Sequence, residues 1–490
     1  MCTLNTFDYE TFETDESVAN TINASADAAT LATDAKTSCA KCGCHEIHIS
    51  LRCKNRYCKA CFLSILTHKF RATLGKSKSV RPNDSILIAH SGKANSTVLA
   101  HLIKANANES VPKRLRCQWK ILYIDGKDTY LILIYKAGTV YVERIRNMLA
   151  TEADDLRLPT LVLSLSRCTI DNLCDEIQSI NVPWASIADN DVLMQEMFSK
   201  LENDTARDEL LHQLRRELLV SAARKLDCNK IFIADTSVDL AIKVLGNVST
   251  GRGSQLSLNV GFSDTRCVDV TLLRPLRDFT EEDVVGYLEC CEIIPVFASL
   301  KYNQPFPASI RSITENFVRR LDSEFHSTVS TIYRTSEKLA TKTNANADIN
   351  DICIICGSTV DSCYSQEQPS VVEARTFSRL VSTGTDCSSN VVSGSLNLYG
   401  QSKDDDEQVE GTGNLDKKIC HCESTACAGI LPNGPSLQPE TLEKYLCYGC
   451  RLIFLNSNGM CTAIPDFIFN KIRKELQITS LRKEITDFLL

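Results

Sequence analysis

A chain of 490 residues is long enough for two or three domains, and its 43% hydrophobic and 23% charged residues are ordinary for a soluble globular protein. No apolar run approaches the roughly 20 residues that cross a bilayer, and the acidic N-terminus lacks the features of a signal peptide, so we expect a cytosolic protein. The net charge of −7 gives the whole molecule no attraction for nucleic acid, so any such contact needs a local basic surface.

The predicted elements begin after residues 1–37, a polar tail without periodicity that we expect to be disordered. From about residue 84 to 330, apolar runs alternate with helical patterns, as in layered α/β domains. Strands are expected at 85–90, 119–125, 158–166, 230–235 and 269–276, and helices at 96–104, 208–226, 237–247 and from Thr280, the N-cap, with Asp283 three residues on.

The chain is therefore predicted to divide into several parts. These are a zinc-binding module with a basic helix (38–80), an α/β domain (81–335), a cysteine-rich module (336–461) with a disordered acidic insertion (362–418), and a helical tail (462–490).

The 24 cysteines of a cytosolic chain are expected to be reduced, and their Cys-x-x-Cys spacing indicates metal binding. The first two pairs, separated by fifteen residues, predict one structural zinc site formed by Cys39, Cys42, Cys58 and Cys61. Cys44 and Cys53 would then be free, and His45 and His48 would be solvated.

A second candidate metal site combines two further pairs, Cys353 with Cys356 and Cys447 with Cys450. Ninety residues separate these pairs, so the spacing alone is a weaker indication than at the first site. Other residues compete as ligands, namely Cys420, His421, Cys422 and Cys427. Four thiolates would leave no open position for catalysis at either site.

A basic stretch follows the first cysteine pairs. Between His48 and Asp84 there are nine cations and no acidic residue. Such a run beside a zinc site predicts contact with the phosphate backbone of RNA, made by Lys69, Arg71, Lys76, Lys78 and Arg81. The alternative is a solvated face that pairs with distant carboxylates.

Residues 91–96, Ser-Gly-Lys-Ala-Asn-Ser, lie between an apolar run and a helical pattern, which is the layout of a phosphate-binding loop. Ser91, Gly92 and Ser96 suit such a loop, whereas Lys93 occupies a position where a second glycine would allow close backbone approach. Taken alone, a single glycine favours an ordinary strand–turn–helix connection.

Several longer stretches are more specific: CAKCGC…YCKACF, HKFRATLGKSKSVRPNDSILIAHSG, ADTSVDLAIKVLGNVSTGRG, LLRPLRDFTEEDVVGYLE and CIICG…CYGCRLIF. With these stretches, most of residues 39–455 resembles the cytoplasmic tRNA 2-thiolation protein 2 family. The resemblance implies a PP-loop, N-type ATP-pyrophosphatase-like domain of the adenine nucleotide alpha hydrolase type over 81–335. Its parallel sheet would be flanked by a zinc-ribbon-like N-terminal module and a cysteine-rich C-terminal module.

Catalytically active relatives carry Ser-Gly-Gly-x-Asp-Ser in the loop, so Lys93 and Asn95 replace the second glycine and the acid. Active thiolating relatives also use a Cys-x-x-Cys and a further cysteine inside this domain, and residues 130–300 contain no Cys-x-x-Cys. The resemblance thus implies a pseudoenzyme without catalytic residues, in which ATP binding is doubtful and the degenerate loop consists of Ser91, Gly92, Lys93, Asn95 and Ser96.

By the same resemblance, the chain would bind tRNA and support a catalytic paralogue, cytoplasmic tRNA 2-thiolation protein 1, in a heterodimer. The complex would 2-thiolate the wobble uridine (mcm5s2U) of tRNAs for Lys, Glu and Gln, with sulfur from the thiocarboxylated ubiquitin-related modifier of the urmylation pathway. Two alternatives stay open: an ATP-dependent tRNA-adenylating sulfurtransferase in which Lys93 replaces the glycine, or a zinc-dependent protein scaffold without RNA contact.

Overall fold

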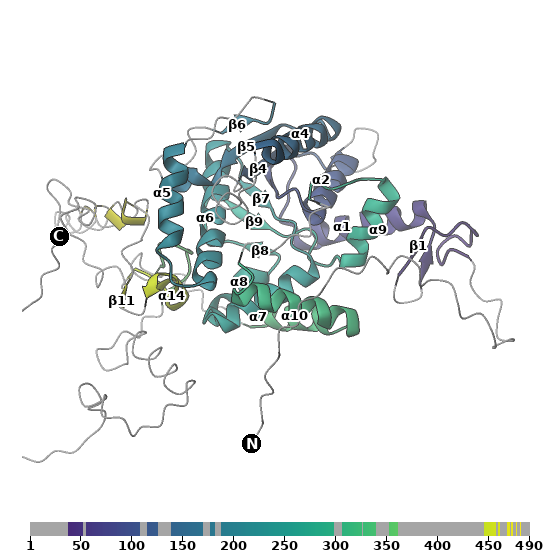
Figure 1. Ribbon diagram of the computed structural model, residues 1–490. Helices are drawn as coiled ribbons and strands as arrows, with labels where there is room; N and C mark the ends of the chain where they lie inside the picture. The colour runs from purple at the N-terminus through teal and green to yellow at the C-terminus, as the bar shows by residue number, and fades with distance from the viewer. Residues whose placement is uncertain are drawn as a thin grey trace, which may run out of the picture. The chain divides into compact units, whose positions relative to one another are not determined.

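The computed structural model (Figure 1) describes residues 38–51, 55–107, 115–125, 139–169, 177–181, 188–297, 306–325, 327–339, 352–360, 445–456, 459–460, 468–470, 472–473, 477 and 481. The segments predicted to be disordered, 1–37 and 362–418, and most of the predicted helical tail lie outside these residues. The chain forms two compact units, Met1–Cys61 and Phe62–Leu490.

In the first unit, a tight turn at Cys39–Cys44 lies beside a short hairpin. Strand β1 (Ile49–Ser50) pairs antiparallel with β2 (Arg56–Tyr57). The Gly43 N–H donates to the Cys39 carbonyl at 2.9 Å, and Gly43 has a φ of +74°, which favours glycine. The Ala40 N–H donates to the Arg56 carbonyl at 2.8 Å and ties the turn to the hairpin.

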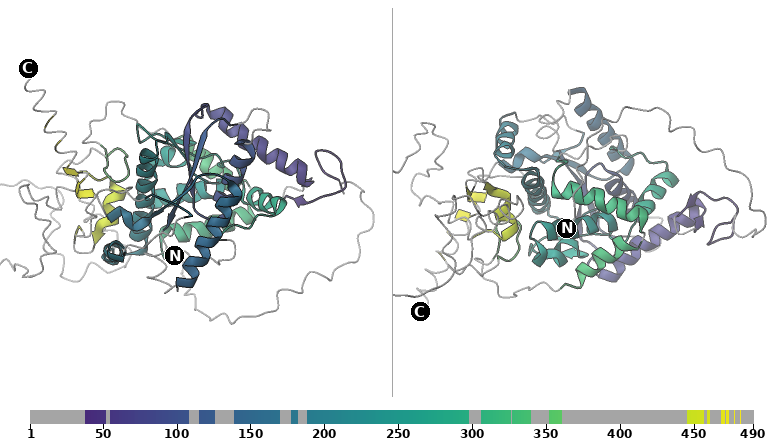
Figure 2. Two further views of the ribbon diagram at one scale, coloured as in Figure 1. Left: turned by 90° about the horizontal axis from the view of Figure 1, so that it is seen from above. Right: turned by 60° about the horizontal axis from the view of Figure 1, so that its bottom comes forward.

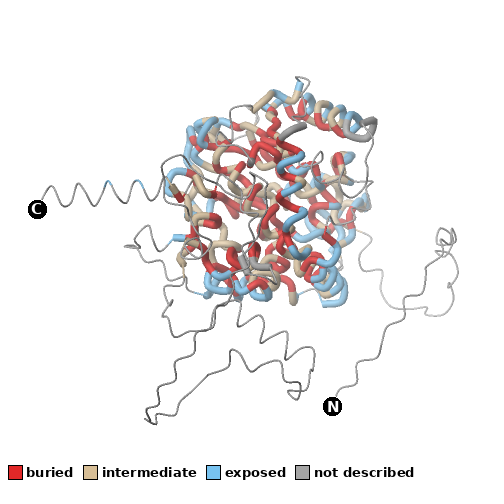
Figure 3. Tube along the Cα trace, turned by 60° about the vertical axis from the view of Figure 1, so that its left-hand side comes forward, coloured by how far each residue is buried: buried red, intermediate tan, exposed pale blue. Residues whose placement is uncertain are grey.

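The second unit is built on a seven-stranded sheet. In spatial order its strands are β6 (Gln178–Ser179), β5 (Thr160–Ser164), β4 (Gln118–Asp125), β3 (Ser85–His90), β7 (Lys230–Phe232), β9 (Thr271–Leu273) and β8 (Ser263–Asp264). The five central strands are parallel, and the two edge strands are antiparallel. Successive residues Ile86, Leu87 and Ile88 are all fully buried, because helices cover both faces of the sheet (Figure 2). Figure 3 shows the buried residues along the chain in red. The expected parallel α/β class is confirmed.

The described helices are α1 (Lys59–Ser77), α2 (Ala94–Ala107), α4 (Thr139–Leu156), α5 (Ala188–Ser199), α6 (Asp204–Lys225), α7 (Ser237–Ser249), α8 (Leu256–Val260), α9 (Glu281–Cys291), α10 (Ile310–Glu324), α11 (Thr328–Glu337) and α14 (Tyr448–Phe454). Short 3-10 turns lie at η1 (Leu165–Thr169) and η2 (Gly253–Gln255), and β10 (Leu455–Asn456) pairs with β11 (Gly459–Met460). None of the described helices combines the length and the apolar character needed to cross a membrane.

Helix α6 joins the sheet to the C-terminal cysteines in one core. Its Leu210, Leu214 and Leu218 pack in the same cluster as Leu87 of β3 and Cys450 of α14. The helix predicted from the spacing of these leucines is confirmed. The helix begins at Asp204, four residues before the expected start, with the Asn203 side chain accepting the Ala206 N–H at 2.9 Å.

The order of the strands defines where a ligand would lie. From β3 the chain passes to β4 and β5 on one side, and from β7 it passes to β9 on the other side. Because β3 and β7 are neighbours, the direction of the connections reverses between them. In open α/β sheets, ligands bind outside the carboxyl ends of the strands at such a reversal.

Candidate functional site

The loop between β3 and α2 lies at this reversal point, and its glycine is covered by another part of the chain. Gly92 has a φ of +73°, and its carbonyl accepts a hydrogen bond from the Phe297 N–H at 3.0 Å. A Cβ at position 92 would lie 2.5 Å from the Phe297 ring. The missing side chain of Gly92 therefore lets Phe297 approach the loop backbone closely. In a phosphate-binding loop the same space would be open to an anion.

The loop hydroxyls are bonded to each other and to the loop backbone. Ser96 Oγ donates to the Lys93 carbonyl at 2.9 Å and accepts the Ser91 N–H at 3.2 Å. The Ser91 and Ser96 hydroxyls are 3.1 Å apart, and Ser96 is buried. Several polar groups with which a phosphate-binding loop would contact its anion are therefore already hydrogen-bonded within this loop.

Asn95 connects the start of α2 to the start of α7. Its Nδ2 donates to Asp239 Oδ2 at 2.8 Å. The same carboxylate oxygen accepts from the N–H and hydroxyl of Thr236, at 3.0 and 2.9 Å, within the capping box of α7. An amide suits this position because it can donate to the Asp239 carboxylate, whereas an ionised acid cannot.

A buried ion-pair group follows β7. The Asp235 carboxylate lies 2.5 Å from Lys243 Nζ and 3.1 Å from Arg274 Nε. Burial opposes the ionisation of Asp235, but the two cations outweigh it and hold the pKa of this carboxyl below its usual value. This group was not predicted, because only the fold brings its members together.

A second buried pair lies at the end of β3, where His90 Nε2 is 3.0 Å from Glu152 Oε2 of α4. Burial raises the pKa of Glu152, but the contact with His90 more than offsets this and leaves the pKa below its usual value. This pair was not predicted either.

The structure separates the five cations that were predicted to contact RNA into two groups. Lys69 Nζ forms an ion pair with Asp283 of α9 at 2.6 Å, and Arg71 Nε donates to Asn106 Oδ1 at 2.5 Å. Lys76, Lys78 and Arg81 are exposed. Lys69 thus pairs with a carboxylate distant in the sequence, as expected if the basic stretch is not an RNA contact. RNA contact by the exposed Lys76, Lys78 and Arg81 stays a prediction.

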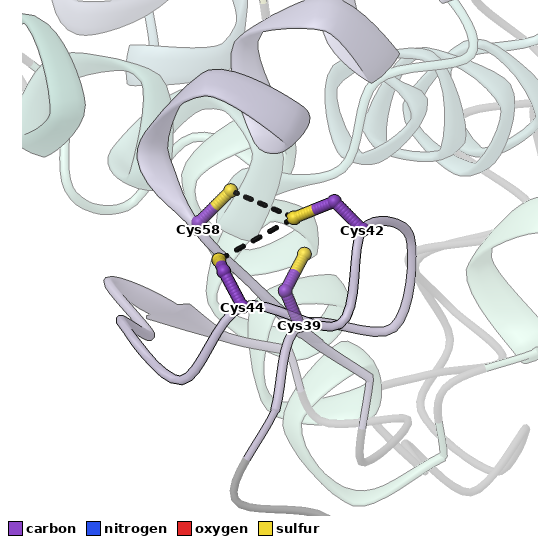
Figure 4. A group of neighbouring side chains, drawn as sticks. All are labelled: Cys39, Cys42, Cys44 and Cys58. Atoms are coloured by element: carbon purple, nitrogen blue, oxygen red, sulfur yellow. Dashed lines mark hydrogen bonds between the residues drawn. The ribbon is translucent and has the colours of Figure 1, made fainter.

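The N-terminal cysteines converge within the first unit (Figure 4). The sulfurs of Cys39, Cys42, Cys44 and Cys58 lie within 4.8 Å of one another, with Cys42 at 3.3 Å from Cys44 and 3.7 Å from Cys58. Cys44, expected to be free, belongs to this group, whereas the predicted ligand Cys61 lies outside it. The Cys61 thiol stays close, since its hydrogen bonds with Cys42 and Cys58 raise its pKa to about 12.

This difference follows from the turn. The left-handed Gly43 directs the chain so that Cys44 returns toward Cys42 (Figure 4), which the spacing of the pairs does not reveal. Backbone N–H groups of Cys58 and Cys42 lower the pKa of the Cys39 thiol to about 6. His45 and His48 are exposed, as expected, and Cys53 lies outside the described residues.

The C-terminal candidate ligands also form one group. The sulfurs of Cys353, Cys356, Cys447 and Cys450 lie within 4.8 Å of one another, and all four residues are buried. The competing ligands Cys420, His421, Cys422 and Cys427 lie outside the part of the chain that the structure describes. Four converging thiols fit a tetrahedral metal ion at each site, with closed coordination.

Buried arginine side chains surround the C-terminal thiols. Arg252 Nη1 lies 3.7 Å from Cys450 Sγ, and its Nη2 donates to the Gly449 carbonyl at 3.0 Å. Arg266 Nη1 donates to the Cys356 carbonyl at 3.3 Å. Both guanidinium groups also form salt bridges, Arg252 with Glu209 at 3.3 Å and Arg266 with Asp264 at 2.5 Å. They would therefore offset only part of the negative charge of a metal bound by four thiolates.

Comparison with known proteins gives consistent results. The family model for cytoplasmic tRNA 2-thiolation protein 2 matches residues 309–452. Cytoplasmic tRNA 2-thiolation protein 2-A of Xenopus laevis is 28% identical over 92% of this chain and 94% of its own length. The protein named cytoplasmic tRNA 2-thiolation protein 2 in Drosophila pseudoobscura pseudoobscura is 32% identical over 70% of this chain and 81% of its own length.

Among solved structures, the U34-tRNA thiolase NcsA from Methanococcus maripaludis with its 4Fe-4S cluster has a TM-score of 0.45 at 17% identity. The match covers 64% of this chain and 93% of that chain.

Proposed function

Since the chain belongs to the cytoplasmic tRNA 2-thiolation protein 2 family, we propose that it is a non-catalytic subunit of the cytoplasmic complex that 2-thiolates the wobble uridine of tRNA. In this proposal the tRNAs are those for Lys, Glu and Gln. The chain binds tRNA and supports a catalytic paralogue, cytoplasmic tRNA 2-thiolation protein 1, in a heterodimer. The complex receives sulfur from a thiocarboxylated ubiquitin-related modifier.

The closed loop is the observation that carries the non-catalytic part of the proposal. Phe297 packs on Gly92, and the hydroxyls of Ser91 and Ser96 bond within the loop. Asn95 is held by Asp239. ATP would have to displace these contacts, and position 95 would offer it no carboxylate for a magnesium ion.

Exposed cations in the last turn of α1 and in the segment that follows it support the tRNA-binding part of the proposal. Lys76, Lys78 and Arg81 lie in solvent, where they can neutralise backbone phosphates. Lys69 and Arg71, which have partners within the protein, would hold the helix in place and contribute less to RNA binding.

We assign structural zinc to both cysteine groups. Zinc is the usual ion of closed four-thiolate sites in proteins. At the N-terminal site either Cys44 or Cys61 would complete the set formed by Cys39, Cys42 and Cys58.

Titration of the purified chain with ATP and magnesium tests the non-catalytic role. We expect no saturable binding in the micromolar range, because the loop is closed by its own side chains. Micromolar, magnesium-dependent binding that Ser96→Ala abolishes would instead support the ATP-dependent enzyme. Ser249→Ala, which changes an exposed hydroxyl on α7, is the matched control.

A further inference from the structure

One face of α6 carries polar residues that meet the start of α10. Asp208, His212 and Arg215 follow at spacings of four and three residues, so they share this face. The Ser309 hydroxyl donates to Asp208 Oδ2 at 2.9 Å, and the Ile310 N–H donates to Thr205 Oγ1 at 3.1 Å. These contacts bring Arg311 of α10 toward the same face.

Positive charge accumulates around His212. Burial and the neighbouring charges of Arg311, Arg215, Lys243 and Lys93 together hold the pKa of His212 well below its usual value. The imidazole is therefore neutral at physiological pH and can share a hydrogen bond with a ligand.

The cations at this place differ in their carboxylate partners. Lys243 and Arg274 form salt bridges with Asp235, and Asp264 also acts on Arg274. Arg215 and Arg311 act on Asp208, which lies near Glu209. Among the described residues, no carboxylate forms a salt bridge with the half-buried Arg215 or Arg311, although such groups normally have an anionic partner.

The position of the cluster is where this fold binds ligands. Lys93 lies in the loop after β3 and Asp235 in the segment after β7, the two strands between which the connections reverse. Guanidinium groups bind phosphate through paired N–H donors. Two half-buried arginines that form no salt bridge within the described residues therefore fit a phosphate group at this edge.

We propose that His212, Arg215 and Arg311, with Lys93 at the rim, form a binding site for a backbone phosphate of RNA. The assignment rests on the proposed function, in which the chain binds tRNA. A polynucleotide phosphate is favoured over a free nucleotide because the loop groups that would hold a pyrophosphate are bonded to one another, and Phe297 covers Gly92. The side chains on α6 and α10 remain to bind a single phosphodiester.

The test is the binding of a fluorescent tRNA transcript to the full-length chain, followed by anisotropy at several salt concentrations. For the double variant Arg215→Gln/Arg311→Gln we expect an affinity at least about tenfold lower. We also expect a slope of log affinity against log salt that is shallower by about 1 to 2, as for one or two lost phosphate contacts. Arg320→Gln on the same helix, which removes an exposed cation paired with Glu324, should change neither quantity.

Three results would overturn the proposal. The first is an unchanged affinity and salt slope in the double variant, and the second is the absence of tRNA binding by the wild-type chain. The third is micromolar binding of inorganic pyrophosphate that the double variant loses while tRNA binding is unchanged, which would assign the site to a free nucleotide. If the glutamine variant fails to fold, Arg215→Lys/Arg311→Lys keeps the charge, and it should weaken binding while retaining the wild-type salt slope.

These results can be separated from a failure of the proposed function. Thiolation by the reconstituted complex depends on the presence of this chain if the proposed function is right. The salt slope reports on this phosphate site alone. A complex that needs the chain but shows no effect of Arg215 and Arg311 on tRNA affinity would reject the site and keep the function.

Discussion

The contacts of Asn95 explain why an amide is stable where catalytically active relatives carry an acid. Asn95 donates to Asp239, a carboxylate that already caps α7 through Thr236. The loss of the acid is therefore matched by a contact with a residue 144 positions further along the chain. Nothing in the local sequence of the loop could have predicted this contact.

Asn95→Asp restores the acid of the active loop, and we expect it to destabilise the chain by about 1–3 kcal/mol at neutral pH, because two carboxylates would face each other. The loss should shrink as the pH falls below about 4, where one carboxyl becomes protonated and can donate. Chemical denaturation from pH 3.5 to 8 measures both effects.

Asn95→Ala is the matched control for this change. It removes the hydrogen bond without adding charge, so it should cost about 1 kcal/mol with little dependence on pH. Equal stability of Asn95→Asp and the wild type at pH 7 would contradict the role of Asp239.

Helix α1 shows how much a charge run in a sequence can predict. The run predicted a basic helix. In the structure some of its cations have partners within the protein, whereas others are exposed. Lys69 packs over the Phe279 ring at 5.2 Å and pairs with Asp283, while Lys76 at the last turn is exposed. The partner of Lys69 lies 214 residues away, so the sequence could not separate inward from outward cations.

Charge reversal at Lys76, Lys78 and Arg81 should lower tRNA affinity at least about tenfold and leave the melting temperature unchanged, because these side chains are exposed. Lys69→Ala should do the opposite and lower stability by about 1 kcal/mol with a small effect on affinity. Thermal melts and anisotropy on the same samples distinguish the two classes. Unchanged affinity after the triple reversal would exclude this end of α1 as an RNA contact.

Other elements were predicted well where the pattern is local. Strand β3 has the expected bounds, and α9 has the expected capping box, with Asp283 bonded to Thr280. Strands β7 and β9 are shorter than their predicted runs. The run of β9 continues into a buried turn, and that of β7 into a half-buried segment without regular structure. The fourth N-terminal thiol depends on the conformation of Gly43, and the covering of Gly92 depends on Phe297, so neither followed from spacing.

Two groups of thiols, one in each compact unit, could each bind a metal ion. The N-terminal group lies in the small unit with little core of its own, whereas the C-terminal group is buried in the main core beside α6. Metal binding at the second group would join Cys353 and Cys356 to Cys447 and Cys450 across ninety residues of intervening chain. Its loss should therefore affect the stability of the large unit.

Metal analysis should show about two equivalents of zinc in the wild type and about one in each of two double variants, Cys42→Ser/Cys58→Ser and Cys356→Ser/Cys450→Ser. Double variants are needed at the N-terminal site because five thiols converge there. The second variant should also lower the melting temperature. Cys117→Ser, outside both groups, is the control, and wild-type zinc content in either double variant would contradict that site.

The central claim is that the chain is required for tRNA thiolation but does not use its own loop for catalysis. The most direct measurement is 2-thiouridine formation on a tRNA transcript by this chain alone, by its catalytic paralogue alone, and by the two together. We expect efficient product only with both chains, at a rate that Ser96→Ala in this chain changes by less than about twofold. Three results would contradict the claim. These are thiolation by this chain alone, thiolation by the paralogue alone at the full rate, and loss of thiolation when Ser96→Ala is introduced into a folded complex.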